Sequence, residues 1–197
     1  MTATVTLAFS ELRSLISKAA RGAGLSWGLA EEAGWAAEWL ARRGMPAADW
    51  ATHWLAACGD GAVSPVEIGI ALVEDCATPL AVNGKVVPDG LTAPGYLLPF
   101  LHRIAEAGSA VAVVSAAGRV AQISSAGEIT FGPAWQRQSS GWWLSNGETA
   151  GLQTGAAARP AVSAEVLDCL EGLALRTTVP RSDASRRNAG STSDDND

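Results

Sequence analysis

Apolar residues recur at intervals of three and four through roughly the first third of the chain, which is the spacing of one helix face. Glycine, proline and serine interrupt this pattern, and the interruptions predict four successive helices. Their expected ranges are Ser10 to Gly22, Ser26 to Gly44, Pro46 to Gly59 and Pro65 to Ala77. The chain therefore should begin with a compact helical unit.

Serine residues mark the expected starts of these helices. Ser10 and Ser26 each precede an apolar-periodic run, where a serine oxygen can accept a hydrogen bond from an unpaired backbone N–H. Ser64-Pro65-Val66-Glu67 combines a capping box with proline at the first helical position, so it is the clearest start signal. Gly44 is expected to end the second helix in a left-handed conformation.

The pattern changes to short β-prone runs further along. Asn83-Gly84 lies between Leu80–Val82 and Lys85–Val87, which predicts a tight β-hairpin. Three short runs between Ser109 and Phe131 are separated by Ala-Gly pairs and predict an antiparallel meander. The run Gly141–Ser145 is expected to add an edge strand.

Two further helices and a polar tail complete the expected fold. One helix runs through Phe100 and Ile104 to Gly108, and a last helix is capped by Ser163. Beyond Pro180 the chain has no large apolar residue. We therefore expect an α+β fold: an N-terminal helical unit, a β-hairpin and antiparallel meander, a C-terminal helix and a polar tail. Residues 1–180 should form a single α+β domain and 181–197 the C-terminal tail.

Composition limits the class of protein. Apolar residues make up 48% of the 197 residues and charged residues 17%, which is typical of a folded chain with a sizeable core. The net charge of −6 disfavours nucleic acid and anionic membranes as partners. No apolar stretch is longer than Ala110–Val114, which is far shorter than the roughly 20 residues of a spanning helix. We expect a soluble, cytoplasmic protein with reduced cysteines.

Tryptophan is concentrated near the N-terminus, where five of the eight tryptophans lie between Ala19 and Trp54. Trp35 and Trp39 stand four residues apart, so a helix places both rings on one face. Two indoles on one exposed face would leave a large apolar patch. At least one of the two should therefore be buried.

Candidate chemistry centres on Arg21-Gly22-Ala23-Gly24, directly before a capped helix. Backbone N–H groups there could bind an anion with Arg21 as charge partner, although a plain glycine-rich turn explains the same residues. The histidines, His53 and His102, do not stand at metal-ligand spacing, and a Cys–His pair stays an open alternative. We expect no metal site, and the sequence names neither a catalytic residue nor a cofactor.

The block Ala19–Ala33 resembles the opening of an uncharacterised bacterial domain-of-unknown-function family (DUF3726-like). The tail resembles the ending of the same family at Val179-Pro180, Ser182, Ser185-Arg186 and Asp195-Asn196-Asp197. The resemblance implies a bacterial, cytoplasmic, stand-alone protein and suggests that its tail docks on the fold, whereas the polar composition of the tail predicts solvated disorder; both alternatives stay open. It brings no activity, substrate or cofactor.

Two functional hypotheses follow. In the first, the protein serves bacterial small-molecule metabolism, with or without catalysis, and binds an anionic, carboxylate-type metabolite. Its ligand-binding residues would be Arg21, Gly22, Gly24, Trp27 and Arg186. In the second, the chain is a non-catalytic subunit or interaction protein whose Trp-rich helices and Trp142-Trp143 cover a protein partner or a second copy of the chain.

Overall fold

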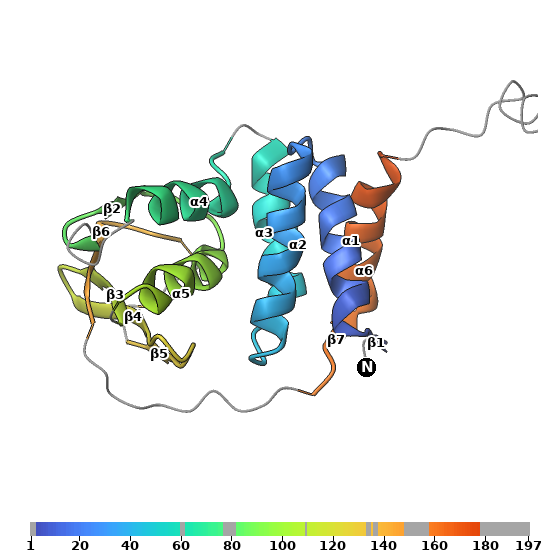
Figure 1. The fold of residues 1–197 in the computed structure, drawn as a ribbon. Coiled ribbons are helices and arrows are strands. Elements are labelled where there is room, and N and C mark those ends of the chain that lie inside the picture. Colours follow the sequence, from blue (N-terminus) through green and yellow to red (C-terminus); the bar gives the residue numbers. More distant parts are fainter. Residues whose placement is uncertain are drawn as a thin grey trace, which may run out of the picture.

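A computed structural model describes most of the chain, namely residues 3–59, 62–76, 82–108, 110–132, 135, 138–147 and 158–177. Four helices lie side by side and form the right-hand half of Figure 1. They are α1 (Phe9–Gly22), α2 (Trp27–Ala41), α3 (Ala47–Gly59) and α6 (Ala164–Leu175). Two more helices, α4 (Pro65–Asp75) and α5 (Leu98–Glu106), lie between this bundle and a β-sheet (Figure 1). A short 3-10 helix, η2 (Pro94–Leu97), leads into α5.

The serine signals predict most helix starts correctly. The hydroxyl oxygens of Ser26, Ser64 and Ser163 accept hydrogen bonds from backbone N–H groups at the starts of α2, α4 and α6. The prediction for Ser10 is wrong, because the N-cap of α1 is Ala8, two residues earlier, and the helix begins at Phe9. The Glu11 carboxylate accepts a hydrogen bond from the Ala8 N–H at 2.6 Å, so an acidic residue satisfies this end instead of a serine.

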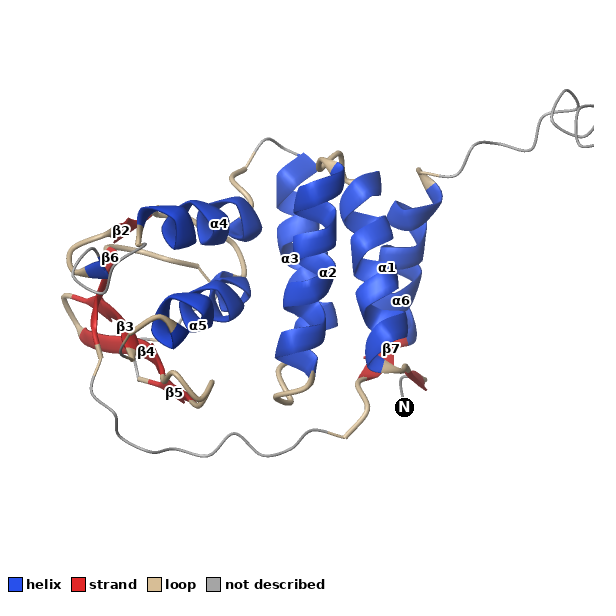
Figure 2. Cartoon of the chain, in the orientation of Figure 1, coloured by secondary structure: helices blue, strands red, loops and turns tan. Residues whose placement is uncertain are grey.

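Five antiparallel strands form the main sheet, in the order β2-β6-β3-β4-β5. Their bounds are Val86–Val87 (β2), Trp142–Asn146 (β6), Val111–Ser115 (β3), Gly118–Ile123 (β4) and Ile129–Phe131 (β5). The predicted meander is confirmed as β3-β4-β5. Figure 2 shows these strands grouped at one end of the molecule, with α5 packed against β3 and β4.

The predicted edge strand is an interior strand. β6 pairs with β3 on one side and with β2 on the other, so both of its edges are hydrogen-bonded. The turn at Asn83-Gly84 exists, with Gly84 at a φ of +78°, but β2 takes β6 as its partner. Leu80 and Ala81, from the expected first arm of the hairpin, lie outside the described residues.

A second, two-stranded sheet joins the start of the chain to the start of α6. β1 (Thr4–Thr6) pairs antiparallel with β7 (Ala161–Ser163) at the foot of the bundle (Figure 1). Ser163 serves both as the last residue of β7 and as the N-cap of α6. This sheet therefore fixes where α6 packs against α1.

Tryptophan side chains of α2 join the bundle to α5. Trp39 is buried, which confirms the expectation for this pair, and its ring centroid lies 5.3 Å from that of His102. Trp35 packs edge-on against Phe100 at 5.5 Å. On α3, Trp54 is fully buried and packs against Tyr96 of η2 at 5.4 Å. The predicted domain boundary at residue 180 lies outside the described residues.

In the part of the chain that the structure describes, every helix is too short or too polar to cross a bilayer. Cys58, Cys76 and Cys169 are free cysteines in the structure.

Candidate functional site

One face of α1 lines a hollow of about 490 Å³ together with the start of α2 and the end of α6. We call this hollow the α1–α2 pocket. Polar α1 residues that recur three and four positions apart provide most of the lining, because a helix turns every 3.6 residues. The lining residues are Ser10, Arg13, Ser14, Ser17, Lys18 and Arg21 of α1, Trp27, Ala30 and Glu31 of α2, and Thr177.

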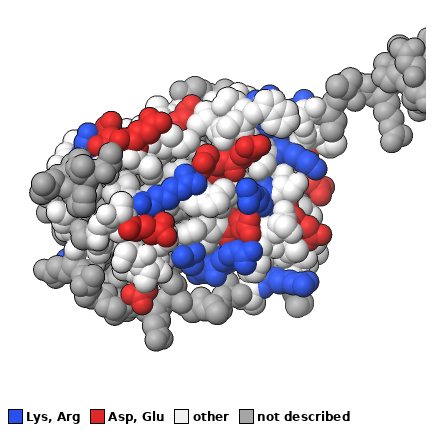
Figure 3. All heavy atoms as spheres, in the orientation of Figure 1, with Lys and Arg blue, Asp and Glu red and all other residues white. Residues whose placement is uncertain are grey.

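The pocket is positively charged although the chain is acidic. Among the described lining residues, Arg13, Lys18 and Arg21 face a single carboxylate, Glu31, whereas the whole chain has a net charge of −6. Elsewhere basic and acidic side chains are interspersed on the face shown in Figure 3. A local surplus of cations in a concave site attracts an anion and raises its local concentration.

Arg21 and Trp27, both singled out from the sequence, lie together in this pocket. The Arg21 guanidinium donates a hydrogen bond to the carbonyl oxygen of Leu25 and lies 4.6 Å from the centroid of the Trp27 ring. These contacts bridge the turn between α1 and α2. Trp27 is 72% exposed, so its ring forms an outer wall of the pocket rather than a buried floor.

The glycines beside Arg21 have a structural explanation. A Cβ at Gly22 would overlap the carbonyl oxygen of Leu173, so glycine permits the close approach of α1 to α6. Gly24 has a φ of +100°, which favours glycine in the turn that follows.

The backbone N–H groups of this turn are already used. Those of Ala23, Gly24 and Leu25 donate to carbonyl oxygens of α1, as expected at the C-terminal end of a helix. These three N–H groups are therefore not available to an anion, and any charge recognition here must come from side chains. Arg186, the fifth predicted site residue, lies outside the described residues.

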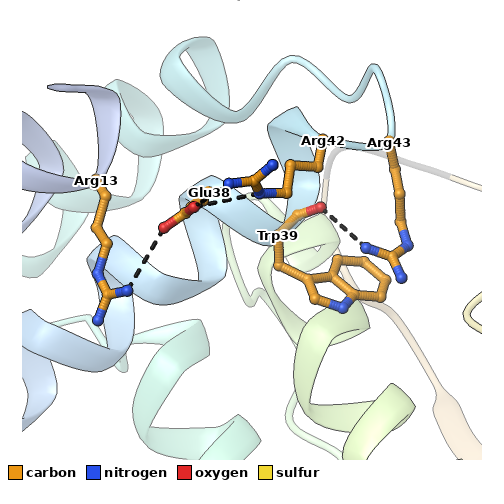
Figure 4. A network of polar contacts seen from close by, with 5 residues as sticks. All are labelled: Arg13, Glu38, Trp39, Arg42 and Arg43. Atoms are coloured by element: carbon orange, nitrogen blue, oxygen red, sulfur yellow. Dashed lines mark hydrogen bonds and ion pairs between the residues drawn. The ribbon is translucent and has the colours of Figure 1, made fainter. Parts of the chain in front are cut away.

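Arg13 belongs to a polar network along the bundle (Figure 4). Its Nη1 lies 3.5 Å from Oε2 of Glu38, while Nη2 of Arg42 lies 2.7 Å from Oε1 of the same carboxylate. Lys18 and Arg21 form no ion pair among the described residues. These two pocket cations therefore have no carboxylate partner in the described part of the chain, and Arg21 is held by Leu25 and Trp27 alone.

Sequence reasoning missed Arg13, Lys18 and the α1 serines as pocket residues. The signal was present, because these residues recur at helical spacing opposite the apolar face of α1. Such a polar face is usually just solvated, so spacing alone gave no reason to select it. What distinguishes it is its closeness to α2 and Thr177, which only the structure shows.

The cysteine and histidine side chains that the sequence offers for catalysis or metal binding do not line this pocket. Burial is the main reason that the pKa of the Cys58 thiol rises to about 11, which keeps it protonated near neutral pH. His102 is buried against Trp39, with Nδ1 3.7 Å from Oε2 of Glu106. Within the described ranges, no three His, Cys, Asp or Glu side chains are placed to hold a metal ion.

Comparison with known proteins gives a similarity for the N-terminal helices of the chain. No curated protein and no solved structure matches it. Residues 7–75 match the sequence model of a family described as a protein of unknown function (DUF3726), a region that includes the α1 and α2 residues of the pocket. The matched region ends before the tail. The similarity of this chain to the DUF3726 family thus covers helices α1 to α4.

Proposed function

We propose that this chain binds a small anionic, carboxylate-type metabolite in the α1–α2 pocket, as a cytoplasmic protein of bacterial small-molecule metabolism. One observation carries the proposal: three cations and one carboxylate surround a hollow of about 490 Å³ in a chain of net charge −6. A pocket of this size suits a small molecule.

Lys18 and Arg21 are the proposed primary contacts for the anion. Lys18 supplies a compact point charge, and the Arg21 fork has five N–H donors, not all of which the Leu25 carbonyl can use. The hydroxyls of Ser14 and Ser17, which line the same wall, can donate further hydrogen bonds. A hydrogen bond to a charged group contributes about 1.5–3 kcal/mol, so two such contacts give useful affinity.

Arg186 belongs to this proposal as a further cation for the same anion. Thr177 lines the pocket, and Arg186 follows it nine positions later. A chain of that length can span up to about 30 Å, which is ample to return to the pocket. Truncation after Val179 is then expected to weaken anion binding while barely changing stability, since residues 180–197 contribute no large apolar side chain.

Isothermal titration calorimetry with succinate, glutarate and citrate tests the proposal, with uncharged succinamide as ligand control. The double substitution Lys18→Gln with Arg21→Gln should weaken binding at least about tenfold. Arg119→Gln removes one positive charge from an exposed position of β4 and should leave affinity unchanged. Equal binding by the double variant, or heat from succinamide equal to that from succinate, would refute the proposal.

A second candidate is an interaction role, favoured by one observation. Val86 is 72% exposed and pairs in register with Trp143, which is 37% exposed, so two apolar side chains meet on the open face of the sheet. Light scattering of the purified chain at increasing concentration tests this role. A mass above 20.2 kDa that returns to the monomer value on Trp143→Ser would favour it.

A further inference from the structure

A second and larger hollow, of about 800 Å³, lies between α3, η2 and the segment that follows β5. We call it the aromatic pocket. Its side walls include the indoles of Trp50 and Trp135, and Asp49 and His53 lie on the α3 side. It shares no described lining residue with the α1–α2 pocket, so an inference about it is independent of anion binding.

The two indoles face one space from distant parts of the chain. Their ring centroids are 6.3 Å apart and their planes are inclined at 49°. Trp135 also contacts Trp142 at 5.9 Å and Phe131 at 4.4 Å, so its ring is fixed by aromatic neighbours on the sheet. Both pocket indoles are only partly buried. They therefore present aromatic surface to whatever enters the pocket.

The wall of the pocket that η2 and the residues before it form has a tightly restricted backbone conformation. A Cβ at Gly95 would overlap the six-membered ring of Trp50, so the backbone of η2 packs directly against this indole. Ala93, beside it, has a φ of +51° and is the only non-glycine residue with positive φ in the described part of the chain. The Tyr96 hydroxyl anchors the segment by donating to the Ala47 carbonyl at 2.9 Å. Strained backbone maintained in this way is commonly found at ligand sites.

The described lining of the aromatic pocket has the opposite balance of charge to that of the α1–α2 pocket. Asp49 is exposed and forms no ion pair among the described residues, and the described lining includes neither lysine nor arginine. The faces of Trp50 and Trp135 add the negative potential of two indole rings. Together these groups repel an anion and attract a cation.

We propose that the aromatic pocket binds a small organic cation that bears a methylated ammonium group. Trp50 and Trp135 contact the methyl groups through cation–π interactions, and Asp49 supplies the countercharge. A methylated ammonium fits better than a primary one, because it has few or no N–H groups and so requires few acceptors. The pocket offers one carboxylate and two large apolar rings, which is the set of partners that such a cation needs.

Tryptophan fluorescence of the full chain, titrated with tetramethylammonium and with choline, tests this assignment. The neutral carbon analogue 3,3-dimethyl-1-butanol serves as the probe that keeps the shape of choline without its charge. Two variants remove the proposed contacts: Asp49→Asn, at an exposed position that should not affect folding, and Trp50→Leu. Their matched controls are Asp168→Asn on the exposed side of α6 and Trp27→Leu on α2.

Saturable quenching by choline is expected in the wild type and in both control variants. Asp49→Asn and Trp50→Leu should each weaken choline binding about tenfold, and the neutral analogue should bind much more weakly than choline. The proposal is overturned if neither cation gives saturable quenching. It is equally overturned if Asp49→Asn retains full affinity, or if the neutral analogue binds as well as choline, since the pocket would then be merely apolar.

Discussion

Gly22 lies where α1 meets α6, and its lack of a side chain permits the contact. The position at which a Cβ would stand is occupied by the carbonyl oxygen of Leu173, a backbone atom that cannot rotate away. Gly28, near the start of α2, has open space around the same position. The two glycines therefore differ in what they do for the fold, although both lie close to the α1–α2 pocket.

Gly22→Ala is expected to destabilise the protein by about 1–3 kcal/mol, because α1 and α6 must move apart. Gly28→Ala should raise stability slightly or leave it unchanged, since alanine costs less conformational entropy than glycine in a helix. Urea denaturation followed by circular dichroism measures both. Equal stability of the two variants would show that the α1–α6 contact can relax without cost.

His102 makes stability depend on pH in a defined direction. Burial lowers the pKa of this imidazole below its ordinary value of 6.5, and the neighbouring Arg43 acts in the same direction, while Glu106 and the Ser125 carbonyl oppose both. Below about pH 6.5 the unfolded chain then binds more protons at this position than the folded chain does. The neutral His102 imidazole therefore contributes its full stabilisation of the folded state above that pH, and this contribution is lost as the pH falls toward the pKa of His102 in the folded state.

The urea concentration at the unfolding midpoint of the wild type should accordingly decrease when the pH is lowered from 7.5 to 5.5. In a His102→Gln variant the midpoint is expected to fall less over the same range, whatever its absolute value, because glutamine does not titrate. Midpoints measured at both pH values in both proteins give the comparison. An identical fall in the variant would assign the pH dependence to other groups.

At the level of elements, the contact of α2 with α5 connects the bundle to the sheet. Trp39 is 9% exposed, and the Arg43 guanidinium lies 3.6 Å from the centroid of its ring. Arg103 of α5 lies over Trp35 in the same way, at 3.7 Å. Each indole is thus covered by an arginine as well as by an aromatic ring, so the junction combines apolar burial with cation–π contacts.

Replacing Trp39 with alanine should cost about 3–5 kcal/mol of stability, the usual range for a buried aromatic ring. Trp27→Ala is the matched control, because this indole is 72% exposed and should cost far less. Thermal melting of both variants supplies the measurement. A Trp39→Ala protein with the same melting temperature as the wild type would contradict the assignment of this ring to the contact between α2 and α5.

Elements with local signals could be predicted from the sequence, and pairings between distant elements could not. Ser26, Ser64 and Ser163 act within one turn of their own helices, so a short window contains the whole signal. The partners of β6 are set by segments far away in the chain, and nothing in Trp142–Asn146 alone says that both edges are paired. The three-residue strands β1 and β7 are too short to show alternation.

At the scale of the whole molecule, the structure has two pockets whose described lining residues carry opposite charge. The α1–α2 pocket has three cations around one carboxylate, whereas the aromatic pocket has Asp49 and two indoles. Sequence reasoning reached Arg21 and Trp27 because they are close in the chain. It missed the aromatic pocket, since Trp50 and Trp135 come together only through the fold.

Native mass spectrometry of the full chain, purified from its own host and gently desalted, detects a retained anion by mass. We expect an added mass that fits a small carboxylate in the wild type and in Arg119→Gln. The same mass should be absent or strongly reduced in the variant that combines Lys18→Gln with Arg21→Gln. A wild-type protein without any added mass, or an adduct that persists equally in the double variant, would contradict anion binding at the α1–α2 pocket.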